Sequence, residues 1–290
     1  MTAKIIAIVF PIFAIVAVGF LYARRHAPDM AAANKINLEI FTPALIFSVL
    51  SGKNFQLAAY QDLALGAVLV VLGSGLIAWP VARWAGYRLK TFLPPMMFTN
   101  SGNMGLPLAV FAFGEQALPA AVVLFLVENF LHFSVGNAML EGRVHPLVLL
   151  RMPMLQATLA GLAVSLLDIP LYEPLRNAVD LLGQISIPLM LFALGVRLTG
   201  VDLGHWRIGL LGSVLCPLSG ILAAVGSARL LGIQDLEFAQ LVLFGALPPA
   251  VLNYMLAEQF GQEPQKVASV VLMGNLGSVL VIPAALVFLL

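Results

Sequence analysis

The sequence predicts an all-α integral membrane protein with ten transmembrane helices, arranged as two inverted repeats of five. Three observations indicate this fold: an apolar composition, ten apolar segments of spanning length and a similarity between the two halves of the chain. Of the 290 residues, 61% are hydrophobic and 10% are charged, whereas a soluble domain carries about 25% charged residues. So few charges cannot cover a water-facing surface, and we therefore expect the chain to fold in a lipid bilayer.

Composition also excludes several kinds of partner and cofactor. The net charge of +1 provides no basic surface for nucleic acid. Cys216 is the single cysteine, which rules out a disulfide within the chain and a multi-cysteine metal site. We expect no cofactor and no metal. The first apolar run, 5–23, is long enough to span and lacks a cleavage site after it, so it is interpreted as a membrane helix and not as a signal peptide.

Ten segments are candidates for membrane spans. A spanning helix needs about 20 mostly apolar residues, and the second and sixth segments are short by this measure. The segments use up the chain and leave no room for a soluble domain. They are 5–23, 34–51, 62–82, 91–113, 117–140, 152–167, 172–196, 206–229, 237–259 and 266–290.

Lysine and arginine lie mostly on one side of these spans. Eleven fall in one set of connections and four in the other, and the basic side of a membrane protein is normally cytoplasmic. We therefore expect a multi-pass protein of the cell (inner) membrane with both termini facing outside. The first set is Arg24, Arg25, Lys35, Arg83, Arg88, Lys90, Arg143, Arg151, Arg197, Arg207 and Lys266, and the second is Lys4, Lys53, Arg176 and Arg229.

The two halves of the chain share a pattern of prolines and glycines. Pro11 and Gly19 correspond to Pro153 and Gly161 at an offset of 142, Pro43 and Phe47 to Pro188 and Phe192 at 145, and Pro107 to Pro249 at 142. This predicts a first repeat over 1–140, a short cytoplasmic connection over 141–151 and a second repeat over 152–290. Five spans per repeat is an odd number, so the second repeat must be inverted, as in many secondary transporters.

Two spans contain residues that interrupt a helix. The fourth reads Phe98-Thr99-Asn100-Ser101-Gly102-Asn103-Met104-Gly105-Leu106-Pro107, and the ninth contains Gly245 to Pro249 and then Asn253. An interior proline costs about 3 kcal/mol and a glycine about 1 kcal/mol relative to alanine, so both helices are expected to break near mid-membrane. Each break exposes a helix N-terminus that favours an anion. The predicted site for a substrate carboxylate comprises Asn100, Asn103, Gly105, Pro107, Pro248, Pro249 and Asn253; the alternative is a pair of proline kinks that only help packing.

Ionisable residues inside a span are functional candidates by default. Glu128 and His132 lie four residues apart on one face of the fifth span, with Asn129 beside them. This group, together with Ser48, is predicted to line a cavity, and Glu128 paired with His132 could carry a coupling proton. The alternative is a structural polar contact between helices.

The crossover motifs resemble those of the auxin efflux carrier family, which includes the plant PIN-formed auxin exporters. The similar residues are Asn100 through Leu108 in the fourth span, then Leu247-Pro248, Ala257-Glu258, Pro264 to Ser269 and Ile282-Pro283, with Pro153, Pro188 and Gly195 also matching. The short connection from Glu141 to Arg151 is similar to that of the compact bacterial members. The resemblance implies a scaffold part, a transport part that holds the broken helices, and a homodimer.

The resemblance also implies the substrate class and some residue roles. Family substrates are organic anions: indole acetate in plants, and dicarboxylates such as malate or malonate proposed for bacteria. Asn100 matches an asparagine that contacts substrate, and Glu128 falls where the plant proteins have a glutamine.

The expected function is alternating-access transport of a small organic anion, and the alternative is a proton- or sodium-coupled symporter of a dicarboxylate. An intramembrane enzyme is disfavoured. There is no HExxH motif, and the four histidines, His26, His132, His145 and His205, are scattered. A channel or receptor is a further alternative, which the paired broken helices disfavour.

Overall fold

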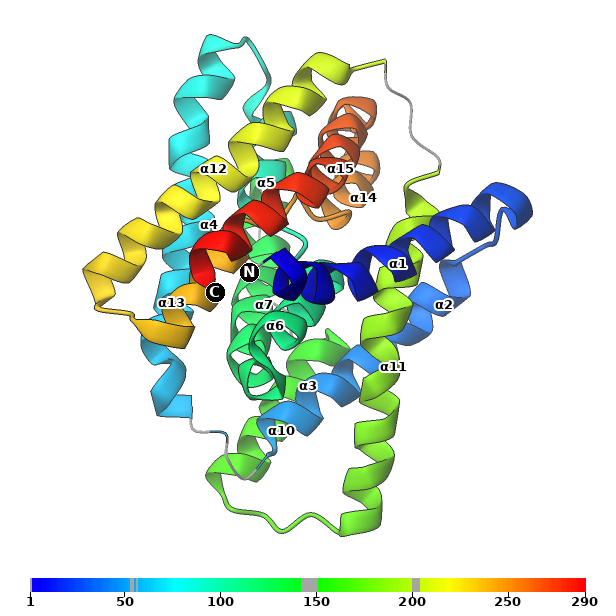
Figure 1. Cartoon of the computed structure of the whole chain (residues 1–290), viewed down its shortest axis with the longest axis vertical. Coiled ribbons are helices and arrows are strands. Elements are labelled where there is room, and N and C mark those ends of the chain that lie inside the picture. The colour runs from blue at the N-terminus through cyan, green and yellow to red at the C-terminus, as the bar shows by residue number, and fades with distance from the viewer. Residues whose placement is uncertain (1, 53–54, 56, 142–150, 200–203) are drawn as a thin grey trace. The chain divides into compact units, whose positions relative to one another are not determined.

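The computed structural model describes residues 2–52, 55, 57–141, 151–199 and 204–290, and the secondary structure within these ranges is helical apart from one isolated backbone bridge (Figure 1). The predicted connection 141–151 lies almost entirely outside the described residues, as do Arg143 and His145.

Six helices of the described chain are long and apolar enough to cross a membrane. This confirms the prediction of an all-helical, multi-pass membrane protein. They are α1 (Thr2–His26), the segment Ala58–Trp84 formed by η2 (Leu57–Tyr60) and α4 (Gln61–Trp84), the segment Glu115–Glu141, α11 (Glu173–Arg197), α12 (Trp206–Leu231) and α15 (Pro264–Leu289). The segment Glu115–Glu141 consists of η4 (Glu115–Ala117), α7 (Leu118–Leu131), the π-helical turn η5 (His132–Gly136) and α8 (Asn137–Glu141).

The other apolar segments form shorter helices. The predicted second span consists of α2 (Ala31–Ile36), η1 (Asn37–Phe41) and α3 (Thr42–Leu50), and the sixth is α10 (Pro153–Leu166). The predicted fourth span is divided into α5 (Leu89–Met97), η3 (Ser101–Gly105) and α6 (Leu106–Phe113), and the ninth into α13 (Asp235–Gly245) and α14 (Leu252–Gln259).

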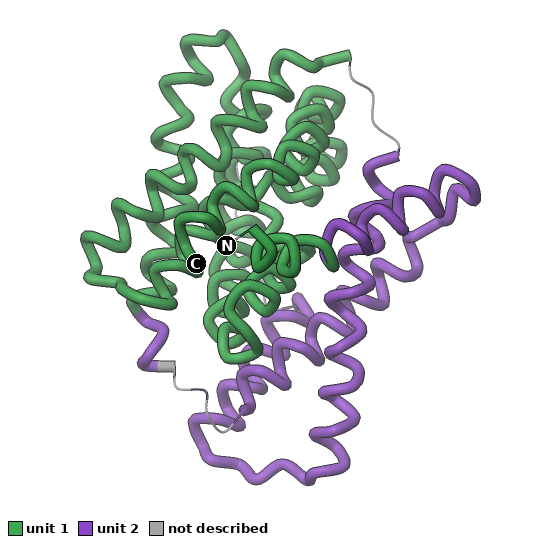
Figure 2. The backbone as a smooth tube through the Cα atoms, in the orientation of Figure 1, with its two compact units in different colours: residues 1–11, 62–144, 200–290 green, residues 12–61, 145–199 purple. Residues whose placement is uncertain are grey.

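The chain forms two compact units (Figure 2). Unit 1 comprises residues 1–11, 62–144 and 200–290, and unit 2 comprises 12–61 and 145–199. Each unit therefore draws on both of the predicted repeats, and both interrupted helices belong to unit 1.

Glycines allow the helices of unit 2 to approach one another closely. A Cβ atom at Gly195 in α11 would lie 2.0 Å from the carbonyl oxygen of Val16 in α1, and one at Gly19 would lie 2.2 Å from that of Phe192. Gly161 in α10 packs against Phe47 of α3. Small residues at such interfaces are typical of membrane helices, because association there depends on close packing and not on the exclusion of water.

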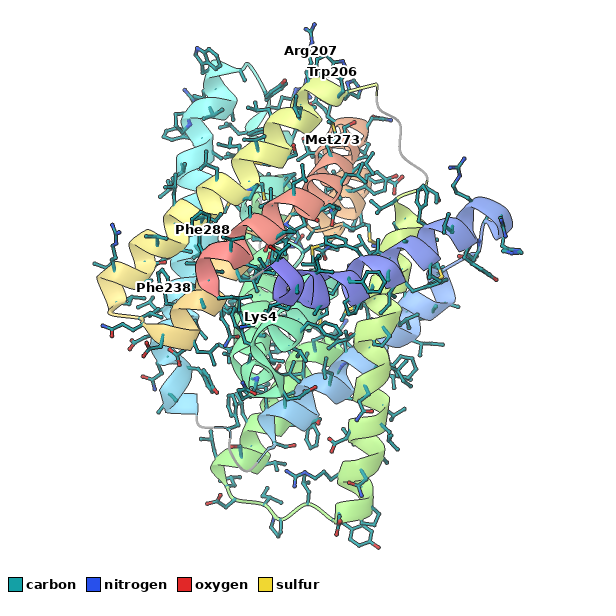
Figure 3. The ribbon with its side chains drawn as sticks, in the orientation of Figure 1. Lys4, Trp206, Arg207, Phe238, Met273 and Phe288 are labelled. Atoms are coloured by element: carbon teal, nitrogen blue, oxygen red, sulfur yellow. The ribbon has the colours of Figure 1, made fainter. Side chains whose placement is uncertain are left out.

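Unit 1 is built around α12, which packs against α15, α13 and α5. Gly220 of α12 and Gly245 of α13 bring two backbones together, since a Cβ at Gly220 would lie 2.0 Å from the Gly245 carbonyl oxygen. Figure 3 shows Trp206 and Arg207 at one end of α12, with Phe238 of α13 towards its other end.

The helices α5 and α15 are tied together at their N-terminal ends. The Thr91 hydroxyl donates a hydrogen bond of 2.7 Å to the Glu263 carboxylate, which also pairs with Lys266. Hydrogen bonds from Lys266 and Thr91 lower the pKa of Glu263 below its usual value. A carboxyl with a lowered pKa stabilises the folded state above its unfolded pKa, and this contribution is lost as the pH falls through the folded value.

Gly195→Ala should destabilise the protein, because the new methyl group would collide with the backbone of α1. Overpacking of this kind typically costs about 1–3 kcal/mol, so we expect a lower melting temperature in detergent micelles. Gly226→Ala in α12 is the matched control, since a Cβ there meets no atom within 4 Å. It should melt at or above the wild-type temperature. Equal melting of Gly195→Ala and wild type would contradict the close contact.

Candidate functional site

Both predicted helix breaks are present in the structure. α5 ends at Met97 and helix resumes at Ser101, while α13 ends at Gly245 and α14 begins at Leu252. The first break differs from the prediction in its extent, because only Phe98–Asn100 is non-helical and Ser101–Gly105 forms a π-helical turn. The amides of Met104 and Gly105 both donate to the Asn100 carbonyl, at 3.0 Å each, which closes this wide turn. Pro107 then falls in the first turn of α6, where a proline needs no N–H partner.

The two non-helical segments pair with each other through their backbones. The Asn100 amide donates to the Pro248 carbonyl at 2.7 Å, and the Ala250 amide donates to the Phe98 carbonyl at 3.0 Å. Thr99 and Pro249 face each other in an antiparallel bridge. This pairing satisfies groups that would otherwise be unpaired at membrane depth, where each would cost several kcal/mol. We call this meeting point of residues 98–105 and 246–253 the crossover.

Two asparagine side chains hold the crossover together. Asn253 donates to the carbonyls of Phe98 at 2.8 Å and Ala250 at 3.0 Å. Asn275 of α15 donates to the Pro249 carbonyl at 3.0 Å and accepts a 3.0 Å bond from the Asn100 side chain. Gly274 beside it leaves room for the Pro249 ring, which a Cβ would approach to 2.4 Å.

Asn275 is a crossover residue that the sequence reasoning missed. It is only 4% exposed in the middle of an apolar helix. The residue type alone could have indicated this role, because a carboxamide inside a spanning helix needs a hydrogen-bond partner within the protein. Of the predicted substrate-binding residues, Asn253 and Asn100 both hydrogen-bond within the crossover, and their binding of substrate stays a prediction.

Glu128 of α7 is buried beside the first break. One of its carboxyl oxygens, Oε1, accepts a hydrogen bond from the Thr99 amide, and the hydroxyls of Thr99 and Ser101 lie close to the carboxyl group. The other oxygen, Oε2, is also buried. Because α5 has ended, the Thr99 amide is free to face the carboxyl group.

His132 does not form the predicted pair with Glu128. Its ring stacks on that of Phe98, with centroids 4.1 Å apart and planes 6° apart, and its side chain lies near that of Asn253. Phe98 can take this position because it has left the helix. The Asn129 side chain is also used locally, since it donates to the Phe125 carbonyl at 2.8 Å.

The remaining predicted residues are distributed differently. Gly105 adjoins Leu247 of the other break, and Asn103 is half-buried in the π-helical turn. Ser48 belongs to unit 2, where it donates a hydrogen bond to Asp180 of α11. The structure therefore gives Ser48 a partner within its own unit.

Helix ends give the crossover its electrostatic character. The helices α5 and α13 end at the crossover. The continuous segment formed by η3 and α6 begins there, and so does α14. Helix starts carry partial positive charge and free N–H groups, which suit a carboxylate, whereas helix ends carry partial negative charge. Buried polar side chains converge on this point: Thr99, Asn100, Ser101, Glu128, His132, Asn253 and Asn275 are each at most 7% exposed.

The described residues contain no group of three His, Cys, Asp or Glu that could hold a metal ion. The fold and its polar centre, in which two interrupted helices meet among buried asparagines, define the class of a polytopic membrane transport protein.

Comparison with known proteins agrees with this class. The family model described as "Membrane transport protein" matches residues 142–286, which is half of the chain. The chain belongs to this family, the auxin efflux carriers, as its crossover motifs predicted.

Two relatives carry transporter names. A Rhizobium meliloti (strain 1021) protein named "Putative malonate transporter" is 27% identical over 303 aligned positions, which cover 96% of this chain and 93% of that protein. An uncharacterized transporter of Methanocaldococcus jannaschii is 24% identical over 269 positions, covering 86% of each chain.

Asn275→Ala should lower the melting temperature, because it removes the partners of Pro249 and Asn100. Hydrogen bonds between membrane helices contribute about 0.6 kcal/mol on average and up to about 1.7 kcal/mol, so a loss of several degrees is expected in detergent. Asn177→Ala, at an exposed position of α11, is the control and should melt like wild type. An unaltered Asn275→Ala would mean that this side chain does not support the crossover.

Proposed function

We propose that this protein is a secondary transporter that moves small organic anions by alternating access, with a substrate carboxylate bound at the crossover. The observation that carries the proposal is the meeting of two helix starts in one buried polar centre. Such a centre offers N–H donors and partial positive charge to an anion. The name of the R. meliloti relative supports a small dicarboxylate as the substrate class.

We further propose the ten-span, inverted-repeat arrangement as its architecture. The contact of Gly19 with Phe192 in unit 2 has a counterpart in the contact of Gly161 with Phe47. The glycines differ by 142 positions and the phenylalanines by 145, and these are the offsets found in the sequence. Two contacts exchanged in this way are expected of repeats related by a two-fold axis.

The same proposal includes the orientation and assembly. Arg207 lies at the start of α12, and Arg88, Lys90 and Lys266 lie around the tied starts of α5 and α15. This clustering supports a cytoplasmic end of unit 1 and both termini outside. The carrier would act in the cell membrane, and the family resemblance makes a homodimer the expected assembly.

Asn100→Ala should weaken the binding of a carboxylate substrate. Losing a hydrogen bond to a charged group costs about 1.5–3 kcal/mol, or roughly 10- to 150-fold in affinity. The measurement is concentration-dependent uptake of labelled malonate, malate, succinate, pyruvate and indole acetate into proteoliposomes.

Asn275→Ala is the matched comparison for this experiment, because it breaks the same Asn100–Asn275 bond but leaves the Asn100 side chain in place. If Asn100→Ala transports with unchanged affinity, or if both variants lose affinity equally, Asn100 is a brace of the crossover and not a substrate ligand.

A specific observation favours the second candidate function, a cation-coupled symporter. The Glu128 carboxyl group already faces the Thr99 amide at the crossover. An ionised carboxylate there would repel an incoming anion, so binding of a dicarboxylate is favoured when a proton or another cation neutralises Glu128. The net charge moved in each transport cycle would then depend on which cation accompanies the substrate.

Glu128→Gln should keep the fold and change the pH dependence of transport, because glutamine can accept the Thr99 bond but cannot titrate. The measurement is substrate flux against internal and external pH for both proteins at a clamped membrane potential. Superimposable pH profiles would reduce Glu128 to a structural residue and favour uncoupled uniport, which a potential of about 100 mV drives with about 2.3 kcal/mol per charge.

A further inference from the structure

Unit 2 contains a cavity at the place where three of its helices end or begin. The helices α3 and α10 end at Leu50 and Leu166, the loop 167–172 follows α10, and α11 begins at Glu173 (Figure 1). The cavity has a volume of about 1100 Å³, and the residues that line it all belong to unit 2. A volume of this size is large enough for a small organic ligand or a lipid headgroup.

The lining of this cavity carries charges of both signs. Arg176 lines it from the start of α11, and Asp168 and Glu173 line it from the loop and from the first turn of the same helix. Ser51 and Asn177 add uncharged polar groups. Within the part of the chain that the structure describes, none of the three charged side chains has an ion pair or a hydrogen bond. Both signs of charge are therefore open to a ligand.

The three charges select the class of ligand. Two carboxylates and one guanidinium leave one net negative charge in the cavity. A purely anionic ligand would therefore meet net repulsion, and a purely cationic ligand would leave Arg176 without a partner. A zwitterion with a phosphate and a primary ammonium group satisfies both signs. The guanidinium donates paired hydrogen bonds to phosphate, and the ammonium group donates up to three hydrogen bonds to carboxylates.

The surroundings of the cavity match those of a membrane lipid. The cavity lies at the end of the helices, where the headgroup region of a bilayer is expected. Leu166, which lines the cavity, is exposed, and so are Leu167 and Leu175, which adjoin lining residues in the chain. Tyr172 is 75% exposed, and tyrosine is enriched at membrane interfaces. These apolar side chains can contact the acyl chains of a lipid whose headgroup fills the cavity.

We propose that the cavity binds the headgroup of a zwitterionic phospholipid with a primary ammonium group, as in phosphatidylethanolamine. Arg176 binds the phosphate, and Asp168 and Glu173 bind the ammonium group. Ser51 and Asn177 can donate further hydrogen bonds to the phosphate oxygens. In the proposed orientation the lipid belongs to the outer leaflet. The inference goes beyond the proposed function, because it concerns unit 2 and no transported substrate.

The test measures which lipids remain bound to the purified protein. Wild type is reconstituted into nanodiscs with equal parts of phosphatidylethanolamine, phosphatidylcholine and phosphatidylglycerol, extracted gently into detergent and examined by mass spectrometry. Phosphatidylcholine is the critical comparison, because its trimethylated ammonium group has no N–H to donate.

Arg176→Gln removes the guanidinium, and Arg229→Gln is the matched control. Arg229 is exposed on α12 in unit 1, and the sequence predicts it on the same side of the membrane as Arg176. We expect wild type and Arg229→Gln to retain phosphatidylethanolamine about tenfold over phosphatidylcholine, as for hydrogen bonds to a charged group. Arg176→Gln should lose most of the bound phosphatidylethanolamine. Melting temperatures in detergent show whether each variant is folded.

Asp168→Asn combined with Glu173→Gln reverses the charge of the cavity. Asparagine tolerates the left-handed backbone of Asp168, whose φ is 49°. With both carboxylates removed, Arg176 leaves a net positive charge, so we expect this variant to retain phosphatidylglycerol over phosphatidylethanolamine. Three results would each overturn the proposal: wild type that retains lipids in proportion to the bilayer, wild type that prefers phosphatidylglycerol, and Arg176→Gln with the selectivity of wild type.

Discussion

Backbone groups that leave a helix inside a membrane must find partners within the protein, and here the two interrupted helices supply them to each other. The Asn100 amide donates to the Pro248 carbonyl, and the Ala250 amide donates to the Phe98 carbonyl. Other features depend on this exchange. Asn253 and Asn275 complete the hydrogen bonding, and Gly274 makes room for the Pro249 ring. Glu128 accepts a hydrogen bond from the Thr99 amide, which the break leaves free. The polar centre of the protein is therefore a consequence of ending two helices at one place.

The positions of the breaks could be predicted from the sequence because their causes are local. Proline, glycine and asparagine oppose a helix wherever they cluster, and α13 ends at Gly245, just before the Pro248-Pro249 pair. The partners of the breaks could not be predicted. Asn275 is separated from Asn100 by 175 positions, and no pattern along the chain links the two. A spacing of four residues favours a Glu128–His132 pair, but it cannot show that the Phe98 ring stacks on the imidazole.

The compact units and the predicted repeats divide the chain in different ways. Each predicted repeat is one continuous stretch of the chain. Each unit, by contrast, combines separate stretches: 62–144 with 200–290 in unit 1, and 12–61 with 145–199 in unit 2. A pattern along the chain reveals the first kind of division, since it compares residues at a constant offset. The second kind arises from contacts such as that of Gly195 with α1, which a single sequence does not display. For this reason the sequence predicts Ser48 beside Glu128, whereas its partner in the structure is Asp180 of its own unit.

The pairing of Thr99 with Pro249 also has a consequence for the assembly of the protein during translation. The partners of the first break are made about 150 residues later, which takes roughly 8–30 seconds at typical synthesis rates of about 5–20 residues per second. During that interval the Phe98 carbonyl and the Asn100 amide lack the partners that they have in the folded protein. The nascent fourth segment is therefore best accommodated at the membrane interface or inside the insertion machinery, and it can settle at full depth once α13 and α14 arrive.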